Sequence, residues 1–190
     1  MNVTPYSAIF DFEIYVLMTM ELRLKMTSEP SERARLGNKL AEHGLTLQDG
    51  KRIHSQMTEA LADEESFFAN LKTFLGVNSN AVEVQFTSVL WPEFDFTASV
   101  GSDGQLSARY HHARGSEARI QPHSVRDIPN WSMDLKEFGE LFGPLSCGLR
   151  HPIFHELIPA YEEHQFEWDG RDYSAGFCWG LFMFAAQHWD

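Results

Sequence analysis

Strict alternation of apolar and polar residues in the middle of the chain constrains its fold more than any other feature. Residues 82–87 and 94–100 each carry an apolar side chain at every second position. A Gly-Ser-Asp-Gly stretch occupies 101–104, and the alternation resumes over 106–110. A period of two, interrupted by glycine-containing turns, is typical of antiparallel strands with one buried face. The sequence therefore predicts an antiparallel β-meander over residues 81–110.

A second alternating stretch lies near the N-terminus. Every even position from Phe10 to Met26 is apolar, and polar residues such as Asp11 and Glu21 occupy many of the odd positions. The pattern predicts a strand with one buried face, although Met, Leu, Glu and Lys favour helix. At the edge of a sheet such a strand would allow pairing with a second copy, so a homodimer is among the expected assemblies.

Helices are expected in the remaining parts of the chain. The segments predicted as helical are 31–43, 53–61, 63–75, 133–142 and 152–161. Residues 174–189 are apolar on all sides, which predicts a central buried helix. At about 15 residues this helix is too short to span a membrane.

These elements assemble into one α+β domain that spans residues 1–190. The predicted antiparallel sheet consists of the N-terminal strand and the central meander. It packs against several helices, and the C-terminal helix is buried in the core. A chain of 190 residues with 43% hydrophobic residues is long enough and apolar enough to build such a core.

The charge balance of the chain narrows its expected partners. Lys and Arg number 15 against 27 Asp and Glu, which gives a formal net charge of -12. An acidic surface repels phosphate backbones and attracts basic proteins, so we expect a basic protein partner, no nucleic acid and no membrane. The two cysteines show no metal or disulfide spacing, and the N-terminus lacks the layout of a signal peptide. A cytoplasmic location is therefore expected.

Carboxylates and aromatic side chains are mixed over residues 162–172. Aromatic residues supply the anchors of many interfaces, and carboxylates select a basic partner. The candidate partner-binding residues are Glu162, Glu163, Glu167, Trp168, Asp169 and Asp172. The alternative interpretation is an ordinary solvated hairpin whose aromatic side chains point into the core.

Residues 109–126 form a basic stretch in this acidic chain. It contains one acid, three histidines and four arginines, namely Arg109, Arg114, Arg119 and Arg126. Guanidinium groups bind phosphate and carboxylate through paired hydrogen bonds, so these arginines are candidates for a small-anion site. The alternative is a solvated loop that pairs with the protein's own acids.

Two histidines and a carboxylate suggest a metal site. His151 and His155 would share one face of a helix, and Glu162, seven residues beyond His155, would return to that face. Such a set would bind Zn²⁺ or Fe²⁺ with positions left open for water. Pro152 and Pro159 argue against an unbroken helix here, so solvated or packed histidines are the alternative.

Familiar catalytic signatures are missing from the sequence. It contains no Walker-type phosphate loop, no Gly-x-Ser-x-Gly elbow and no zinc-finger spacing, and no residue is assigned a catalytic role. The leading hypothesis is a non-enzymatic protein-binding domain without a cofactor, such as an acidic inhibitor or immunity protein that neutralises a basic toxin. The alternative is a metal-dependent hydrolase that uses zinc or iron at His151, His155 and Glu162.

Overall fold

Helices make up the first part of the chain in the computed structural model, which describes residues 5–25, 30–113, 124–156 and 158–188. They are α1 (Pro5–Thr19), α2 (Glu21–Lys25), α3 (Pro30–Glu42), α4 (Leu47–Leu61) and α5 (Phe67–Phe74). The last three confirm the helices predicted within the first half of the chain. None of the described helices is both long enough and apolar enough to cross a bilayer.

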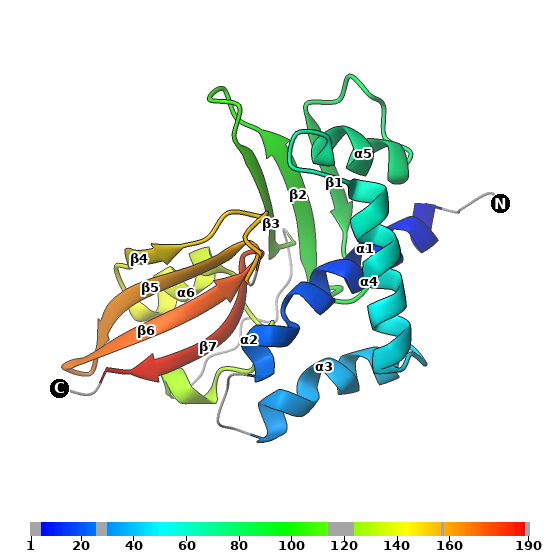
Figure 1. The fold of residues 1–190 in the computed structure, drawn as a ribbon. Coiled ribbons are helices and arrows are strands. Elements are labelled where there is room, and N and C mark those ends of the chain that lie inside the picture. Colours follow the sequence, from blue (N-terminus) through cyan, green and yellow to red (C-terminus); the bar gives the residue numbers. More distant parts are fainter. Residues whose placement is uncertain (1–4, 26–29, 114–123, 157, 189–190) are drawn as a thin grey trace.

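The N-terminal strand predicted over residues 10–26 is wrong, because this segment forms α1 and α2. α1 lies between α4 and the first sheet (Figure 1), and it buries neighbouring positions alike, including Val16 and Leu17. A helix that is covered on most sides is apolar nearly all round, so its sequence shows no helical period. The edge strand on which the homodimer prediction depended is therefore not formed by this segment.

Three strands form the first sheet, which confirms the predicted meander. They are β1 (Glu83–Thr87), β2 (Phe94–Val100) and β3 (Leu106–His112), antiparallel in the order β1-β2-β3. Even-numbered side chains such as Phe96 and Tyr110 are buried against the helical layer, where the ring centroids of Phe96 and Phe12 lie 5.2 Å apart. Odd-numbered side chains point to the opposite, more exposed face.

Four strands form the second antiparallel sheet, so the buried helix predicted over 174–189 is wrong. In sheet order they are β4 (Ser146–Arg150), β5 (Tyr161–Trp168), β6 (Arg171–Cys178) and β7 (Leu181–Gln187). Trp179 and Gly180 have φ angles of 51° and 81°, and this pair of positive angles forms the tight turn between β6 and β7. From Tyr173 onward β6 is buried on both faces, so it lacks the alternation that identifies a half-exposed strand.

One short helix, α6 (Leu135–Phe142), covers a face of the second sheet and confirms the helix predicted over 133–142. Its Phe138 ring packs against those of Phe166 and Phe177, with centroids 5.0 and 5.5 Å away. A 3-10 turn, η1 (Val125–Asp127), precedes it. The helix predicted near 152–161 is wrong: an irregular connection joins β4 to β5, as its two prolines would favour.

The two sheets meet at the turn between β6 and β7 (Figure 1). Trp179 is 1% exposed, and its carbonyl accepts a hydrogen bond of 2.7 Å from the Tyr110 N–H of β3. Its own N–H donates to the Ala160 carbonyl at 2.9 Å, and its indole N–H donates to the Thr19 hydroxyl at 3.0 Å. This one residue therefore joins the first sheet, the second sheet and α1.

Candidate functional site

A cleft of about 720 Å³ lies beside the β6–β7 turn, between β3 of the first sheet and the β4–β5 connection of the second. One wall consists of Leu106–Arg109 of β3 and the hairpin loop that precedes it. The other wall consists of residues 150–154 and 160–162, and the floor includes Trp179 and Gly180. A concave surface of this size, bordered by β3 and by two connections, is a candidate place for a ligand or a partner's side chains.

Gly180 allows the turn to approach β3 closely enough to form the floor of the cleft. Its φ angle is 81°, a conformation that side chains rarely adopt. A Cβ atom at this position would lie 2.6 Å from the carbonyl oxygen of Tyr110 and 3.1 Å from the Cβ atom of Arg109. Any larger residue would therefore push the two sheets apart at the cleft.

Arginine and glutamate side chains meet at the inner end of the cleft. Glu162 is 8% exposed, and its carboxylate lies 3.3 Å from His164 Nε2 and 4.0 Å from Arg150 Nε. Burial alone would raise the pKa of Glu162, but the hydrogen bond to His164 and the charges of Arg109 and Arg150 outweigh it and lower the pKa. Glu162 is therefore an ionised internal counter-ion for the two arginines that line the cleft.

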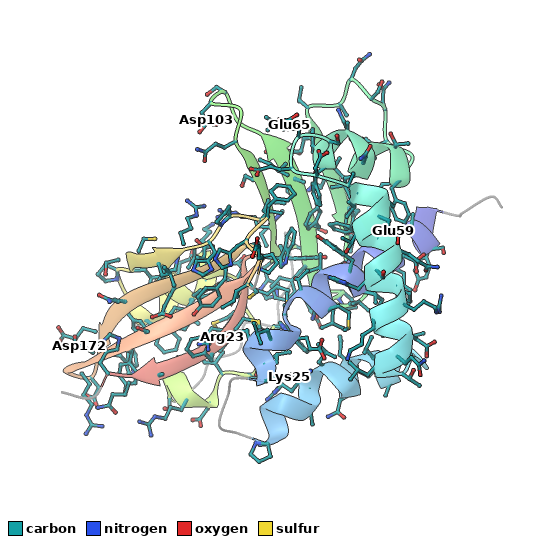
Figure 2. All side chains as sticks on the ribbon, viewed as in Figure 1. Arg23, Lys25, Glu59, Glu65, Asp103 and Asp172 are labelled. Carbon is teal, nitrogen blue, oxygen red and sulfur yellow. The ribbon has the colours of Figure 1, made fainter. Side chains whose placement is uncertain are left out.

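Carboxylates border the outer end of the cleft. Glu64, from the α4–α5 connection, and Asp103, from the β2–β3 hairpin, both line it and are exposed. Asp63 and Glu65 flank Glu64, and Figure 2 shows Glu65 and Asp103 at the same end of the molecule. Among the described residues, none of these four acids forms an ion pair. We call Asp63, Glu64, Glu65 and Asp103 the rim acids.

The rim acids were missed in the sequence. In the sequence Asp63, Glu64 and Glu65 fall at the start of the helix predicted over 63–75, and Asp103 falls in the predicted turn at 101–104. Nothing local links the two groups, because the pairing of β2 with β3 and the packing of α5 against β2 bring them to one end of the molecule. Their excess of negative charge was the only available signal.

The structure does not bring the predicted anion-binding arginines together. Arg109 lines the cleft, whereas Arg126 donates a 3.1 Å hydrogen bond to Gln187 at the far end of β7. Arg114 and Arg119 lie outside the described residues. The basic residue that accompanies Arg109 is instead Arg150, which follows from the pairing of β4 with β5.

The predicted metal ligands lie near one another but do not converge as a set. His151 and His155 lie in the irregular connection, with ring centroids 3.8 Å apart, and His155 Nδ1 accepts a 3.2 Å hydrogen bond from the Ile158 N–H. The Glu162 carboxylate is engaged with His164. Within the described parts of the chain, no three His, Cys, Asp or Glu side chains form a group that could hold a metal ion.

The six candidate partner-binding residues separate into four environments. Glu162 lines the cleft, and Glu163 accepts a 2.8 Å hydrogen bond from the Tyr161 hydroxyl. Trp168 packs against Phe142 with a centroid distance of 5.0 Å, so it is not a free interface anchor. The acids that remain exposed around the β5–β6 turn are Glu167, Asp169 and Asp172, of which Figure 2 labels Asp172. We call these three the hairpin acids.

Known proteins offer no direct comparison for this arrangement. No family model matches the chain, and neither a curated protein nor a solved structure shows significant similarity to it. The cleft, the rim acids and the hairpin acids are therefore the features of the chain that bear on its function.

Proposed function

We propose that the protein is a non-enzymatic binding domain that docks a basic partner protein, in the manner of an inhibitor or immunity protein. The observation that carries this proposal is that two of the rim acids, Glu64 and Asp103, are exposed and line the cleft. The negative electrostatic potential of a carboxylate is not neutralised when no basic side chain lies beside it. Such a potential attracts cationic proteins and selects among them. The net charge of -12 acts in the same direction over longer distances.

The rim acids are a better docking surface than the hairpin acids because they adjoin a concave surface. Interfaces gain most of their energy from a few side chains that fill well-packed pockets, surrounded by polar contacts that exclude water. The cleft supplies such a pocket, with Leu106 and Phe154 among the residues that line it. Aspartates and glutamates at its mouth would pair with lysines and arginines around the partner's anchor residue.

Affinity capture tests this proposal. The tagged protein is incubated with lysate of its source cells and washed at moderate ionic strength, and the retained proteins are identified by mass spectrometry. We expect a basic protein in stoichiometric amount whose affinity, measured with purified components, falls as salt screens the charges. Failure to retain any basic protein contradicts the proposal.

Charge reversal then locates the docking surface. Glu64→Lys/Asp103→Lys changes two rim acids, and Glu167→Lys/Asp172→Lys changes two hairpin acids. We expect the first pair to weaken binding of the captured protein by roughly tenfold or more, about 1.4 kcal/mol, and the second pair to have a smaller effect.

The matched control is Glu93→Lys/Asp127→Lys. Both residues are exposed, neither lines the cleft, and the substitution alters the net charge by the same amount. Equal weakening by all three pairs would show that only overall charge matters, and would contradict a docking surface at the cleft.

A further inference from the structure

The wall of the cleft formed by β3 is the edge of the first sheet. In an antiparallel sheet, alternate residues direct their backbone N–H and C=O groups toward one neighbour or the other. The Ala113 N–H, just after β3, bonds to Glu93 and so faces β2. The N–H groups of His112 and Tyr110 instead bond to the Asp134 carboxylate and to the Trp179 carbonyl. The backbone N–H and C=O groups of the even-numbered β3 residues therefore point away from β2, toward the outer edge of the sheet.

The same row of outward groups continues into the cleft at Ala108 and Leu106. Among the described residues, no backbone or side-chain group bonds to their N–H or C=O groups on this side. The described residues thus form hydrogen bonds with one half of this β3 edge and leave the outward N–H and C=O groups of Leu106 and Ala108 without a partner among them, although Ala108 itself is only 7% exposed. An open strand edge is a template for a further strand, because each unpaired N–H and C=O accepts a backbone partner.

Trp179 shows where an added strand would lie. Its carbonyl oxygen, 2.7 Å from the Tyr110 nitrogen, occupies the place of a carbonyl from a neighbouring strand. Beyond it toward Leu106 the neighbouring position is the cleft itself, with Arg150 and residues 151–154 on the far wall. Paired strands lie about 4.8 Å apart, and the cleft of about 720 Å³ lies along this part of β3, where an added strand would be placed.

Charge favours one kind of segment and one orientation. Asp103 and Glu64 stand at the Leu106 end of the open edge, whereas Arg109 and Arg150 stand at the Ala108 end. Lysine or arginine is therefore favourable at the first end and unfavourable at the second. We propose that an extended segment of a basic partner protein adds to β3 as a strand, paired with Leu106 and Ala108, with its basic residues beside Glu64 and Asp103. This proposal rests on the proposed function and specifies its binding mode.

Two proline substitutions compare the open edge with another edge of the same sheet. In β1 the Ser88 N–H, just beyond the strand, bonds to Phe94 of β2, so the Gln85 N–H points outward on the opposite edge of the sheet. Leu106→Pro and Gln85→Pro each remove one outward N–H that the sheet does not use. Only Leu106→Pro removes a donor in the cleft, so Gln85→Pro is its matched control.

The probe is a fluorescein-labelled peptide, KKVTVTVT, with an analogue N-methylated at alternate residues as its control. Binding is followed by anisotropy, and backbone amide signals of isotope-labelled protein are followed by NMR. We expect the peptide to slow hydrogen exchange at the Leu106 and Ala108 amides. We expect the N-methylated analogue and Leu106→Pro to lose at least tenfold in affinity, while Gln85→Pro binds as the unaltered protein does.

Several results would overturn strand addition. One is that the peptide leaves hydrogen exchange at the Leu106 and Ala108 amides of the unaltered protein unchanged. The others are that the N-methylated analogue binds as tightly as the peptide, or that Gln85→Pro loses as much affinity as Leu106→Pro. Protection of the same two amides by raising the protein concentration alone would instead identify a second copy of the chain as the occupant. If Leu106→Pro does not fold, the exchange measurement on the unaltered protein decides by itself.

The two proposals fail in distinguishable ways. A captured basic protein that depends on the rim acids, but leaves the Leu106 and Ala108 amides unprotected, refutes strand addition and leaves the docking surface standing. Failure to capture a basic protein refutes the proposed function, while the peptide titration still reports on the open edge.

Discussion

Glu13 offers the sharpest test of how the fold around β3 is held together. Its side chain is 0% exposed, and one carboxylate oxygen accepts hydrogen bonds from the N–H groups of Val89 and Leu90 at 2.8 and 2.9 Å. The other oxygen lies 3.3 Å from the hydroxyl of Tyr110 on β3. Glu13 thus joins α1 to the β1–β2 connection and to the strand that borders the cleft.

Replacing this carboxylate separates the effect of its hydrogen bonds from that of its charge. Glu13→Ala removes the acceptor of the Val89 and Leu90 N–H groups and of the Tyr110 hydroxyl, and each buried donor left without an acceptor costs about 1–3 kcal/mol. We therefore expect the free energy of unfolding to fall by about 3 kcal/mol or more, a large part of the 5–15 kcal/mol typical of a domain. In Glu13→Gln the amide oxygen still accepts from Val89 and Leu90, so we expect a change of less than about 1.5 kcal/mol at neutral pH.

The pH dependence has a definite sign. Burial raises the pKa of Glu13 above its ordinary value of 4.5, although hydrogen bonds from Ser88, Leu90, Val89 and Tyr110 oppose the shift. The folded protein then holds this proton more tightly than the unfolded chain does. Its contribution to stability is full below pH 4.5 and is lost as the pH rises through the folded pKa. The unaltered protein should therefore lose stability relative to Glu13→Gln over that range.

Urea unfolding, followed by tryptophan fluorescence at several pH values, measures both effects. Glu93→Gln, at an exposed glutamate, is the control for losing one carboxylate anywhere on the surface. Equal stability of Glu13→Ala and Glu13→Gln would refute the role of the hydrogen bonds. A difference between the unaltered protein and Glu13→Gln that does not vary with pH would refute the argument from the buried charge.

Two further predictions concern the second sheet. A Cβ atom at Gly176 would lie 2.1 Å from the Phe184 ring, so Gly176→Ala should lower the free energy of unfolding by about 2–3 kcal/mol. At Gly148 an added Cβ atom would meet nothing closer than 3.6 Å, so Gly148→Ala should change the free energy of unfolding by less than about 0.5 kcal/mol. Urea unfolding measures both variants, and equal destabilisation by the two would contradict this packing. Cys147 is exposed, whereas burial raises the pKa of Cys178 to about 12, so iodoacetamide should label Cys147 alone in the folded protein. Mass spectrometry of the labelled peptides checks this, and labelling of Cys178 without denaturant would contradict its burial.

Sequence patterns predicted the elements that bury only one face. The β-meander has one face against α1 and one toward solvent, so its residues alternate as the strand geometry requires. α6 likewise buries Phe138 and Phe142 while Lys136 and Glu140 stay exposed. In both cases the spacing of apolar and polar residues along the sequence indicates which face is buried and which is exposed.

Elements buried on more than one side could not be assigned in this way. α1 is covered by α4 and by the first sheet, and β6 is covered on both faces, so neither shows the period of its own structure. The site was hidden for a different reason. Glu64, Asp103 and the open edge of β3 come together only through the pairing of strands and the position of Trp179, none of which is a local property of the sequence.

Amide hydrogen exchange of the whole chain, with and without the captured basic protein, is the most direct test of docking at the cleft. Docking at the cleft predicts slower exchange over residues 101–109 and 150–154, with the β5–β6 turn unchanged. Protection confined to the turn around Asp169, or to surfaces that do not line the cleft, would contradict it.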